Sequence, residues 1–235
     1  MIRKVSAAAL LLLLCVFIAA AQAETVSFAG LSDALKYLKK NQPEALTIEA
    51  GKFKPSELIK VKNALPEGTE FHFTVNWSNI PYSDETEELN LRELKGAVKK
   101  EDLEALVALC PNLRAVDNSA KWYPTNNEMI ELIEKYPQVH FDWIVSFGKG
   151  HYCATNATTF STMNPPSSGK ELTSAKLELL KYIPNLKALD LGHNDVTTLD
   201  FLKYVPDLEL LIIGQNHVKD ITPVGEQKHL QYAEL

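Results

Sequence analysis

The chain has 235 residues, 46% apolar and 23% charged, and its 24 basic and 30 acidic residues give a formal net charge of −6. This composition is typical of a globular domain large enough to bury a sizeable core. An acidic chain without a basic cluster argues against nucleic acid as a partner, because nucleic-acid binding depends on Lys and Arg that neutralise phosphates.

The first 23 residues have the features of a signal peptide. Arg3 and Lys4 form a charged start, an apolar run follows over 7–20, and Ala21-Gln22-Ala23 is a cleavage site of small residues. No second apolar run of about 20 residues follows, so no membrane span is expected. We therefore expect a mature chain that begins at Glu24 and is secreted or held at the cell surface.

The chain has three cysteines. Cys15 lies inside the apolar run, and lipidation there is disfavoured because the preceding Leu14 is not small. Cys110 and Cys153 remain in the mature chain, where they either pair or stay free. Two cysteines do not make a disulfide-rich scaffold.

Short helices are predicted wherever apolar residues recur at helical spacing. Their ranges are 31–38, 55–65, 102–109, 128–136 and 174–182, and Ser32 or Asp33 is the expected cap of the first. Strands are predicted near 45–49, 69–75, 87–92, 113–117, 139–145, 158–162, 186–191, 208–213 and 230–234. The pattern predicts about nine strand-and-helix units within a single domain, 24–235.

A larger period is superimposed on these units. Pro43, Pro111 and Pro184 each lie between a helical and a strand-like segment and define a super-repeat of about 70 residues. His72-Phe73 and His140-Phe141 follow the same period. Two insertions, near 78–86 and 148–157, are rich in Pro, Gly, Asn and Asp and are expected to be irregular loops at one edge of the stack.

The clearest repeat covers 184–235. Its pattern is Leu-x-x-Leu-x-Leu-x-x-Asn, with Leu186, Leu189, Leu191 and Asn194 recurring 22 residues later as Leu208, Leu211, Ile213 and Asn216. The alternation predicts a short strand, and the Asn amide is expected to bond the backbone of neighbouring turns. One such unit cannot bury its apolar face alone, so stacked units forming a solenoid are predicted.

This stretch resembles the leucine-rich repeat family, and its 22-residue unit is similar to the internalin type. The resemblance implies an α/β solenoid, or horseshoe, with a parallel sheet on the concave face and short helices on the convex face. It also implies that the concave face holds another protein. The resemblance is most specific at 184–235, weaker over 31–147, and does not cover the two insertions.

The last strand ends at Leu235, in the position that Ile213 occupies one repeat earlier. The array therefore lacks a visible C-terminal cap. An open strand edge invites pairing with another chain. We expect either a truncated form of a longer array or self-association of two copies through the C-terminal edge.

Two groups of residues are candidates for binding. The predicted concave-face residues are His72, Thr74, Asp117, His140, Asp190, Ile212 and Glu234. The predicted rim aromatics, which follow strands or lie in the insertions, are Trp77, Trp122, Tyr123 and Tyr152. An exposed Ile among polar neighbours and exposed Tyr or Trp are both typical of binding patches. Alternatively, the aromatic residues cover the apolar core, and the concave-face residues are ordinary strand positions exposed to solvent.

Catalysis and metal binding are not predicted. His151 and Cys153 lie two positions apart but have no visible orienting partner, and a catalytic Cys-His pair is normally built from distant segments. His193 and His217, with Asp195 nearby, are too few for a closed metal site. The pattern contains no motif for a catalytic triad, a phosphate loop or a cofactor.

The sequence therefore predicts an exported binding protein, not an enzyme, whose partner is a protein or peptide of unknown identity. The alternative is a structural or spacer segment of a larger cell-surface or envelope protein. No cofactor, nucleic acid or membrane span is expected.

Overall fold

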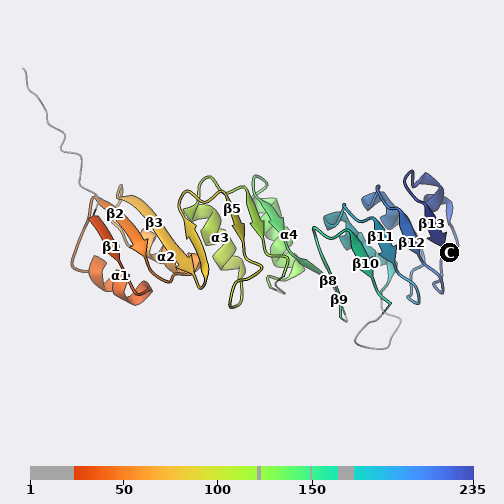
Figure 1. Cartoon of the computed structure of the whole chain (residues 1–235), viewed down its shortest axis with the longest axis horizontal. Helices are drawn as coiled ribbons and strands as arrows, with labels where there is room; N and C mark the ends of the chain where they lie inside the picture. The colour runs from red at the N-terminus through yellow and green to blue at the C-terminus, as the bar shows by residue number, and fades with distance from the viewer. Residues whose placement is uncertain (1–23, 121–122, 149, 164–171) are drawn as a thin grey trace, which may run out of the picture.

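The computed structural model describes residues 24–120, 123–148, 150–163 and 172–235, so the predicted signal peptide lies outside the described residues. The strands are β1 (Glu24–Ser27), β2 (Ala45–Ala50), β3 (Glu70–Trp77), β4 (Ile80–Ser83), β5 (Glu88–Asn90), β6 (Ala115–Asp117), β7 (His140–Asp142), β8 (Ile144–Gly148), β9 (His151–Ala154), β10 (Thr159–Ser161), β11 (Ala188–Asp190), β12 (Leu210–Ile212) and β13 (Tyr232–Glu234). The elements follow one another in chain order along the long axis of the molecule (Figure 1).

The helical segments alternate with these strands. They are α1 (Leu31–Leu38), α2 (Pro55–Asn63), α3 (Lys100–Leu109), α4 (Asn126–Lys135), α5 (Ser174–Leu177) and the 3-10 helices η1 (Glu178–Tyr182), η2 (Asp200–Tyr204) and η3 (Thr222–Glu226). Every stretch predicted as a strand contains one, and every predicted helix is present within a few residues of its predicted ends. The cap of α1 was predicted wrongly, because the residue before the helix is Gly30 and the helix begins at Leu31. No helix in the described ranges has the length and apolar character that a membrane crossing requires.

The parallel sheet is divided. Three parallel groups are present, β1-β2-β3, β5-β6-β7 and β10-β11-β12-β13. The stretches expected to be irregular loops instead contain β4 and β9, which pair antiparallel with β3 and β8. The first hairpin turns at Ser78, whose φ of 57° is the left-handed conformation that two-residue hairpin turns use. Because β4 occupies one edge of β3, β5 cannot continue that sheet.

The super-repeat is visible in the strand register. Leu46 of β2 lies opposite Phe71 of β3, and Val116 of β6 lies opposite Phe141 of β7, each 70 positions later in the chain. Residue 140 therefore corresponds to residue 70, and the predicted match of His72 with His140 is wrong by two positions. A shift of two residues leaves every side chain on the same face, so the alternating pattern alone cannot detect it.

The C-terminal repeats confirm the predicted role of Asn. The Asn194 amide nitrogen donates to the carbonyls of Leu191 and Gly192, at 3.0 and 3.1 Å, and its oxygen accepts from the Leu172 N–H. Asn216 bonds the Leu191 and Ile213 carbonyls in the same manner, at 2.8 Å each. Each amide thus satisfies backbone groups at a sharp bend, which is buried at Asn194 and partly buried at Asn216.

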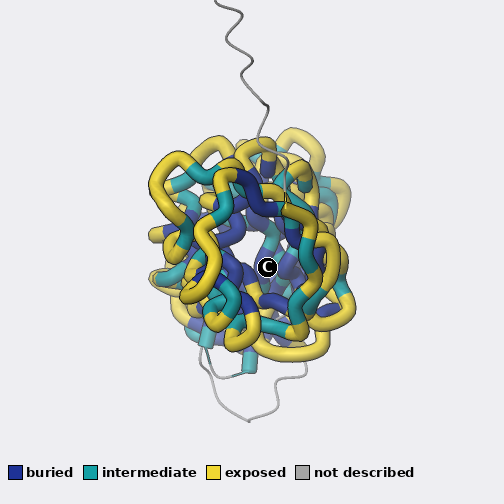
Figure 2. Tube along the Cα trace, turned by 90° about the vertical axis from the view of Figure 1, so that its left-hand side faces the viewer, coloured by how far each residue is buried: buried dark blue, intermediate teal, exposed yellow. Residues whose placement is uncertain are grey.

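One apolar cluster runs through the described part of the chain. It extends from Ala34 in α1 to Ile213 beyond β12 and includes inward residues of all three parallel groups. Viewed along the long axis, the trace winds around this buried interior while exposed residues lie outside (Figure 2). The outward side of the strands and the two hairpins are therefore the exposed surfaces that can hold a binding site.

Candidate functional site: the strand face and the edge pocket

The outward residues of β10 to β13 form one polar row with an apolar residue in it. Asp190, Ile212 and Glu234 lie side by side in register, while Leu189 and Leu211 point inward and are fully buried. This confirms the predicted inward register of the two leucines. Asp190 is partly buried and fixed, because its carboxylate accepts from Ser161 Oγ and from the Gly192 N–H, at 3.0 and 3.1 Å.

The middle sheet has a similar row. Asp117 and Asp142 lie opposite each other, and Asp117 accepts from the Ser119 N–H at 2.9 Å. His140 is exposed, and its Nε2 lies 3.4 Å from Asp142 Oδ1. These side chains therefore form a polar surface with fixed carboxylates.

The first sheet carries the remaining predicted face residues, His72 and Thr74. His72 Nδ1 lies 2.7 Å from Asp84 Oδ2, and Nε2 lies 3.2 Å from Glu70 Oε1. Hydrogen bonds to Asp84 and then to Glu70 raise the pKa of His72. Thr74 is exposed opposite Ser83. The predicted face residues are thus outward, but they are distributed over three separate sheets.

The aromatic prediction is partly wrong. Trp77 is 2% exposed and belongs to the core, because it is an inward residue of β3. Trp122 lies outside the described residues. Tyr123 and Tyr152 are 62% and 42% exposed, and both line one pocket.

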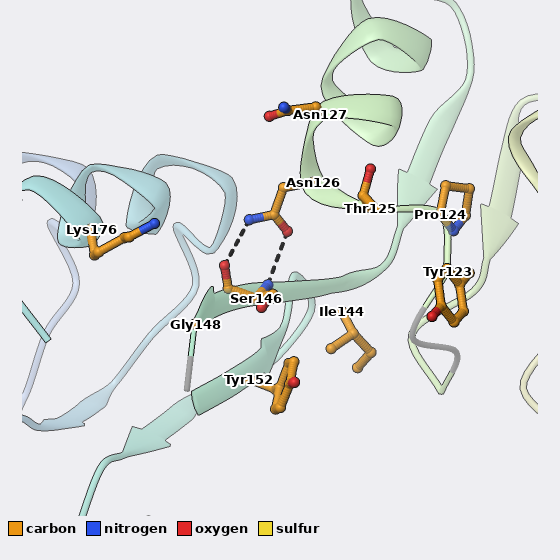
Figure 3. Close-up of a pocket in the computed structure, with 10 residues that line it drawn as sticks. All are labelled: Tyr123, Pro124, Thr125, Asn126, Asn127, Ile144, Ser146, Gly148, Tyr152 and Lys176. Atoms are coloured by element: carbon orange, nitrogen blue, oxygen red, sulfur yellow. Dashed lines mark hydrogen bonds between the residues drawn. The ribbon is translucent and has the colours of Figure 1, made fainter. Parts of the chain in front are cut away.

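This pocket, here called the edge pocket, has a volume of about 450 Å³. It is lined by Tyr123, Pro124, Thr125, Asn126, Asn127, Ile144, Ser146, Gly148, Tyr152 and Lys176. Figure 3 shows that β8 runs through it, with the start of α4 on one side and the Tyr152 ring on the other. Among the described residues, the pocket combines two exposed aromatic rings, several amides and hydroxyls, and the charged side chain of Lys176.

Asn126 is the residue that sequence reasoning missed. Its Nδ2 donates to the Ser146 carbonyl at 2.7 Å, and its Oδ1 accepts from the Ser146 N–H at 2.9 Å (Figure 3). Asn126 is the first residue of α4, held there by the capping box of Thr125 and Glu128. The Thr-x-x-Glu signature was readable from the sequence, but the partner strand was not.

The two candidate cysteines and His151 are buried, whereas the turn residues His193 and His217 are exposed. Cys110 and Cys153 are both free and buried, and burial raises the pKa of each thiol to about 12. His151 is also buried, at 5% exposure. His217 Nε2 lies 3.5 Å from Asp195 Oδ1. A thiol of such high pKa is almost entirely protonated near neutral pH, which disfavours it as a nucleophile.

No protein-family model matches the chain, and no curated protein is similar to it in sequence. Among solved structures, it is similar to internalin C2 from Listeria monocytogenes, with 14% identity, a TM-score of 0.26, and coverage of 91% of this chain and 76% of that chain. It is also similar to internalin InlF from the same species, with 11% identity and a TM-score of 0.28, covering 86% of this chain and 51% of that one. The chain thus spans about half the length of InlF. TM-scores of this size do not establish a shared overall fold.

Proposed function

We propose that the protein is an exported leucine-rich repeat solenoid that binds a protein or peptide partner through the outward face of its strands. The observation that carries this proposal is the row formed by Asp190, Ile212 and Glu234. A partly exposed apolar side chain, Ile212, between two carboxylates provides an anchor that can be desolvated within a polar rim.

The other predicted face residues extend this surface. His72, Thr74, Asp117 and His140 also lie on the outward side of their strands, and each is at least partly exposed. The carboxylates of Asp117 and Asp190 are held by backbone N–H groups, so little conformational entropy is lost when a partner meets them.

The test uses a double variant, Asp190→Lys with Ile212→Ala. A partner captured from the host's extracellular material is first purified, and its affinity for each variant is then measured. We expect a loss of affinity of about 2 kcal/mol, roughly 30-fold, with little change in the melting midpoint. The matched control is Asp200→Lys with Ile221→Ala, which makes the same changes at exposed positions away from the row. Equal affinities for the double variant and the control would show that the strand face is not the binding surface.

A further inference from the structure

The parallel sheet breaks between β7 and β10, and a pocket lies at the break. β7 ends the second parallel group and β10 begins the third, with the hairpin of β8 and β9 between the two groups (Figure 1). The pocket, here called the break pocket, has a volume of about 880 Å³. It is lined by β7, by Asn156 and by the turn that holds Tyr182 and Asn185. The segments that form it, 133–143, 155–156 and 181–185, are described without a gap.

The break pocket lies beside β7 and not on either face of it. The outward residues His140 and Asp142 line it, and so do the buried residues Phe141 and Trp143. Consecutive side chains of a strand point to opposite faces, so only a space beside the strand meets both sets. Because β6 occupies one edge of β7, the pocket lies at the other edge.

The backbone of Phe141 is directed to this edge. The His140 N–H donates to the Arg114 carbonyl at 2.7 Å, and the Asp142 carbonyl accepts from the Asn118 N–H at 2.9 Å. Residues 140 and 142 therefore direct their backbone groups toward β6. Backbone groups alternate in direction along a strand, so the N–H and C=O of Phe141 are directed away from β6 and toward the break pocket.

Two residues further along, the chain itself occupies the same edge. The Thr155 N–H donates to the Trp143 carbonyl at 2.9 Å, and Thr155 Oγ1 accepts from the Trp143 N–H at 3.1 Å. The chain then turns away, because the Ala157 N–H donates to the Ala154 carbonyl at 3.0 Å. Pairing of this edge therefore ends at Trp143, and Phe141 has no strand partner there within the described residues.

Trp143 also carries an unsatisfied donor. The residue is 4% exposed, and its indole N–H is buried without a hydrogen-bond partner in the described part of the chain. Burial of a donor without an acceptor is unfavourable. The indole ring packs against Tyr182, with ring centroids 5.4 Å apart, so both aromatic residues belong to the wall of the break pocket.

We propose that the break pocket binds an extended peptide segment of the partner, which pairs with the backbone of Phe141 and supplies a carbonyl acceptor to the Trp143 indole. This inference rests on the proposed function, because it specifies how the partner is held. A strand edge offers one N–H and one C=O, and a peptide backbone carries the same two groups at every residue. Addition of an extended peptide to a sheet edge is an established mode of recognition.

The lining side chains define the chemistry of the segment. Main-chain bonds give affinity without selecting a sequence, and flanking pockets select side chains. Tyr182 is partly exposed and offers aromatic surface for an apolar or proline side chain. Lys181 and Glu134 are exposed lining residues that have no ion-pair partner among the described residues. The favoured segment is therefore an apolar residue flanked by an acidic residue for Lys181 and a basic residue for Glu134.

The probe for the test is a library of random unstructured decapeptides, selected on the purified full chain. Affinities of selected peptides are measured for the wild type, Asn185→Trp and Asn112→Trp. Both asparagines are exposed and lie in a Pro-Asn-Leu sequence that precedes a strand, but Asn112 is not among the residues that line the break pocket. Because the new ring occupies the pocket, Asn185→Trp should weaken binding more than tenfold, whereas Asn112→Trp should leave affinity unchanged.

A second measurement identifies main-chain pairing directly. Each amide of a selected peptide is N-methylated in turn. Only alternate amides of a paired strand face its neighbour, so methylation should abolish binding at the amide that bonds Phe141 and be tolerated at the amides on either side of it. Fluorescence of Trp143, observed with the other tryptophans replaced by Phe, should change on binding, while fluorescence of Trp77 observed in the same manner should not.

The outcomes separate this inference from the proposed function. Peptides whose binding is unchanged in Asn185→Trp overturn the break pocket as the site, and peptides that bind without the methylation pattern overturn strand pairing. Peptides lost only in the Asp190→Lys, Ile212→Ala variant place binding on the strand face and overturn the break pocket while supporting the proposed function. Failure of the library to yield any binding peptide also overturns the break pocket, and the proposed function is then judged by its own test.

Discussion

At the scale of single residues, His72 shows how the two halves differ at equivalent positions. The first half has the series Glu70, His72, Asp84, and in the second His140 lies 3.4 Å from Asp142, which accepts from Thr155 Oγ1 at 2.7 Å. In the first half, His72 lies between the carboxylates of Glu70 and Asp84. In the second half, the Asp142 carboxylate lies between His140 and the Thr155 hydroxyl. A contact between a histidine and a carboxylate is present in both halves, with the order of the two residue types reversed.

The stability contributed by His72 should depend on pH. Its pKa is raised above 6.5, so its contribution is fully present below about pH 6.5 and is lost as pH rises through the raised pKa. Burial raises the pKa of Asp84, but hydrogen bonds from His72 and the Phe73 N–H outweigh this and leave it below 3.8. The contribution of Asp84 is therefore present above about pH 4 and lost as pH falls through the lowered pKa.

We predict that the stability difference between the wild type and His72→Gln is largest near about pH 5 to 6 and shrinks toward pH 9. Urea melts at a series of pH values measure it. In an Asp84→Asn background the same substitution should show a weaker pH dependence, because the main partner of His72 has lost its charge. A difference that stays constant across this range would contradict the assignment.

At the scale of elements, each strand is short and depends on its inward residue. β12 has three residues, with Leu211 fully buried between two outward neighbours, Leu210 and Ile212. Three residues supply few ladder bonds. The strand is therefore held mainly by the burial of that side chain.

Leu211→Ala should lower the free energy of unfolding by about 2–5 kcal/mol, because it removes a fully buried side chain and leaves a cavity. Leu210→Ala removes the same atoms from the outward side of the same strand and should cost distinctly less. Denaturant melts of both variants provide the comparison. A loss below about half a kcal/mol for Leu211→Ala would show that the inward register of β12 is wrong.

At the scale of the whole molecule, the sheets are interrupted but the core is not. The apolar cluster of the described residues passes both hairpins, and Phe147 of the second hairpin stacks on Phe160 of β10, with ring centroids 4.8 Å apart. Backbone pairing is therefore not what joins the two halves. Continuous side-chain packing joins them.

We predict that the described domain unfolds in one transition. Far-UV circular dichroism and the separate fluorescence of Trp77 and Trp143, observed in variants with the other tryptophans replaced by Phe, should give the same urea midpoint. Trp77 reports on the first sheet and Trp143 on the second hairpin. Midpoints that differ by more than about 0.5 M urea would mean that the two halves unfold independently.

The sequence by itself determined the positions of the helices and of the strands other than β4 and β9, the inward side of β11 and β12, and the hydrogen-bonding role of Asn194 and Asn216. These features follow from local spacing. A 22-residue repeat fixes where each strand recurs, alternation fixes which side chains are buried, and an Asn three positions after the last strand Leu bonds the turn beside it.

Only the tertiary structure decided which edges are paired. Whether Trp77 is a rim residue or a core residue, and whether Asn126 reaches Ser146, depends on how two hairpins fold back against β3 and β8. Edge pairing joins residues far apart in the chain, and a shift of two positions leaves the apolar pattern unchanged. The edge pocket has no signature in the sequence, because its described lining residues come from segments far apart in the chain.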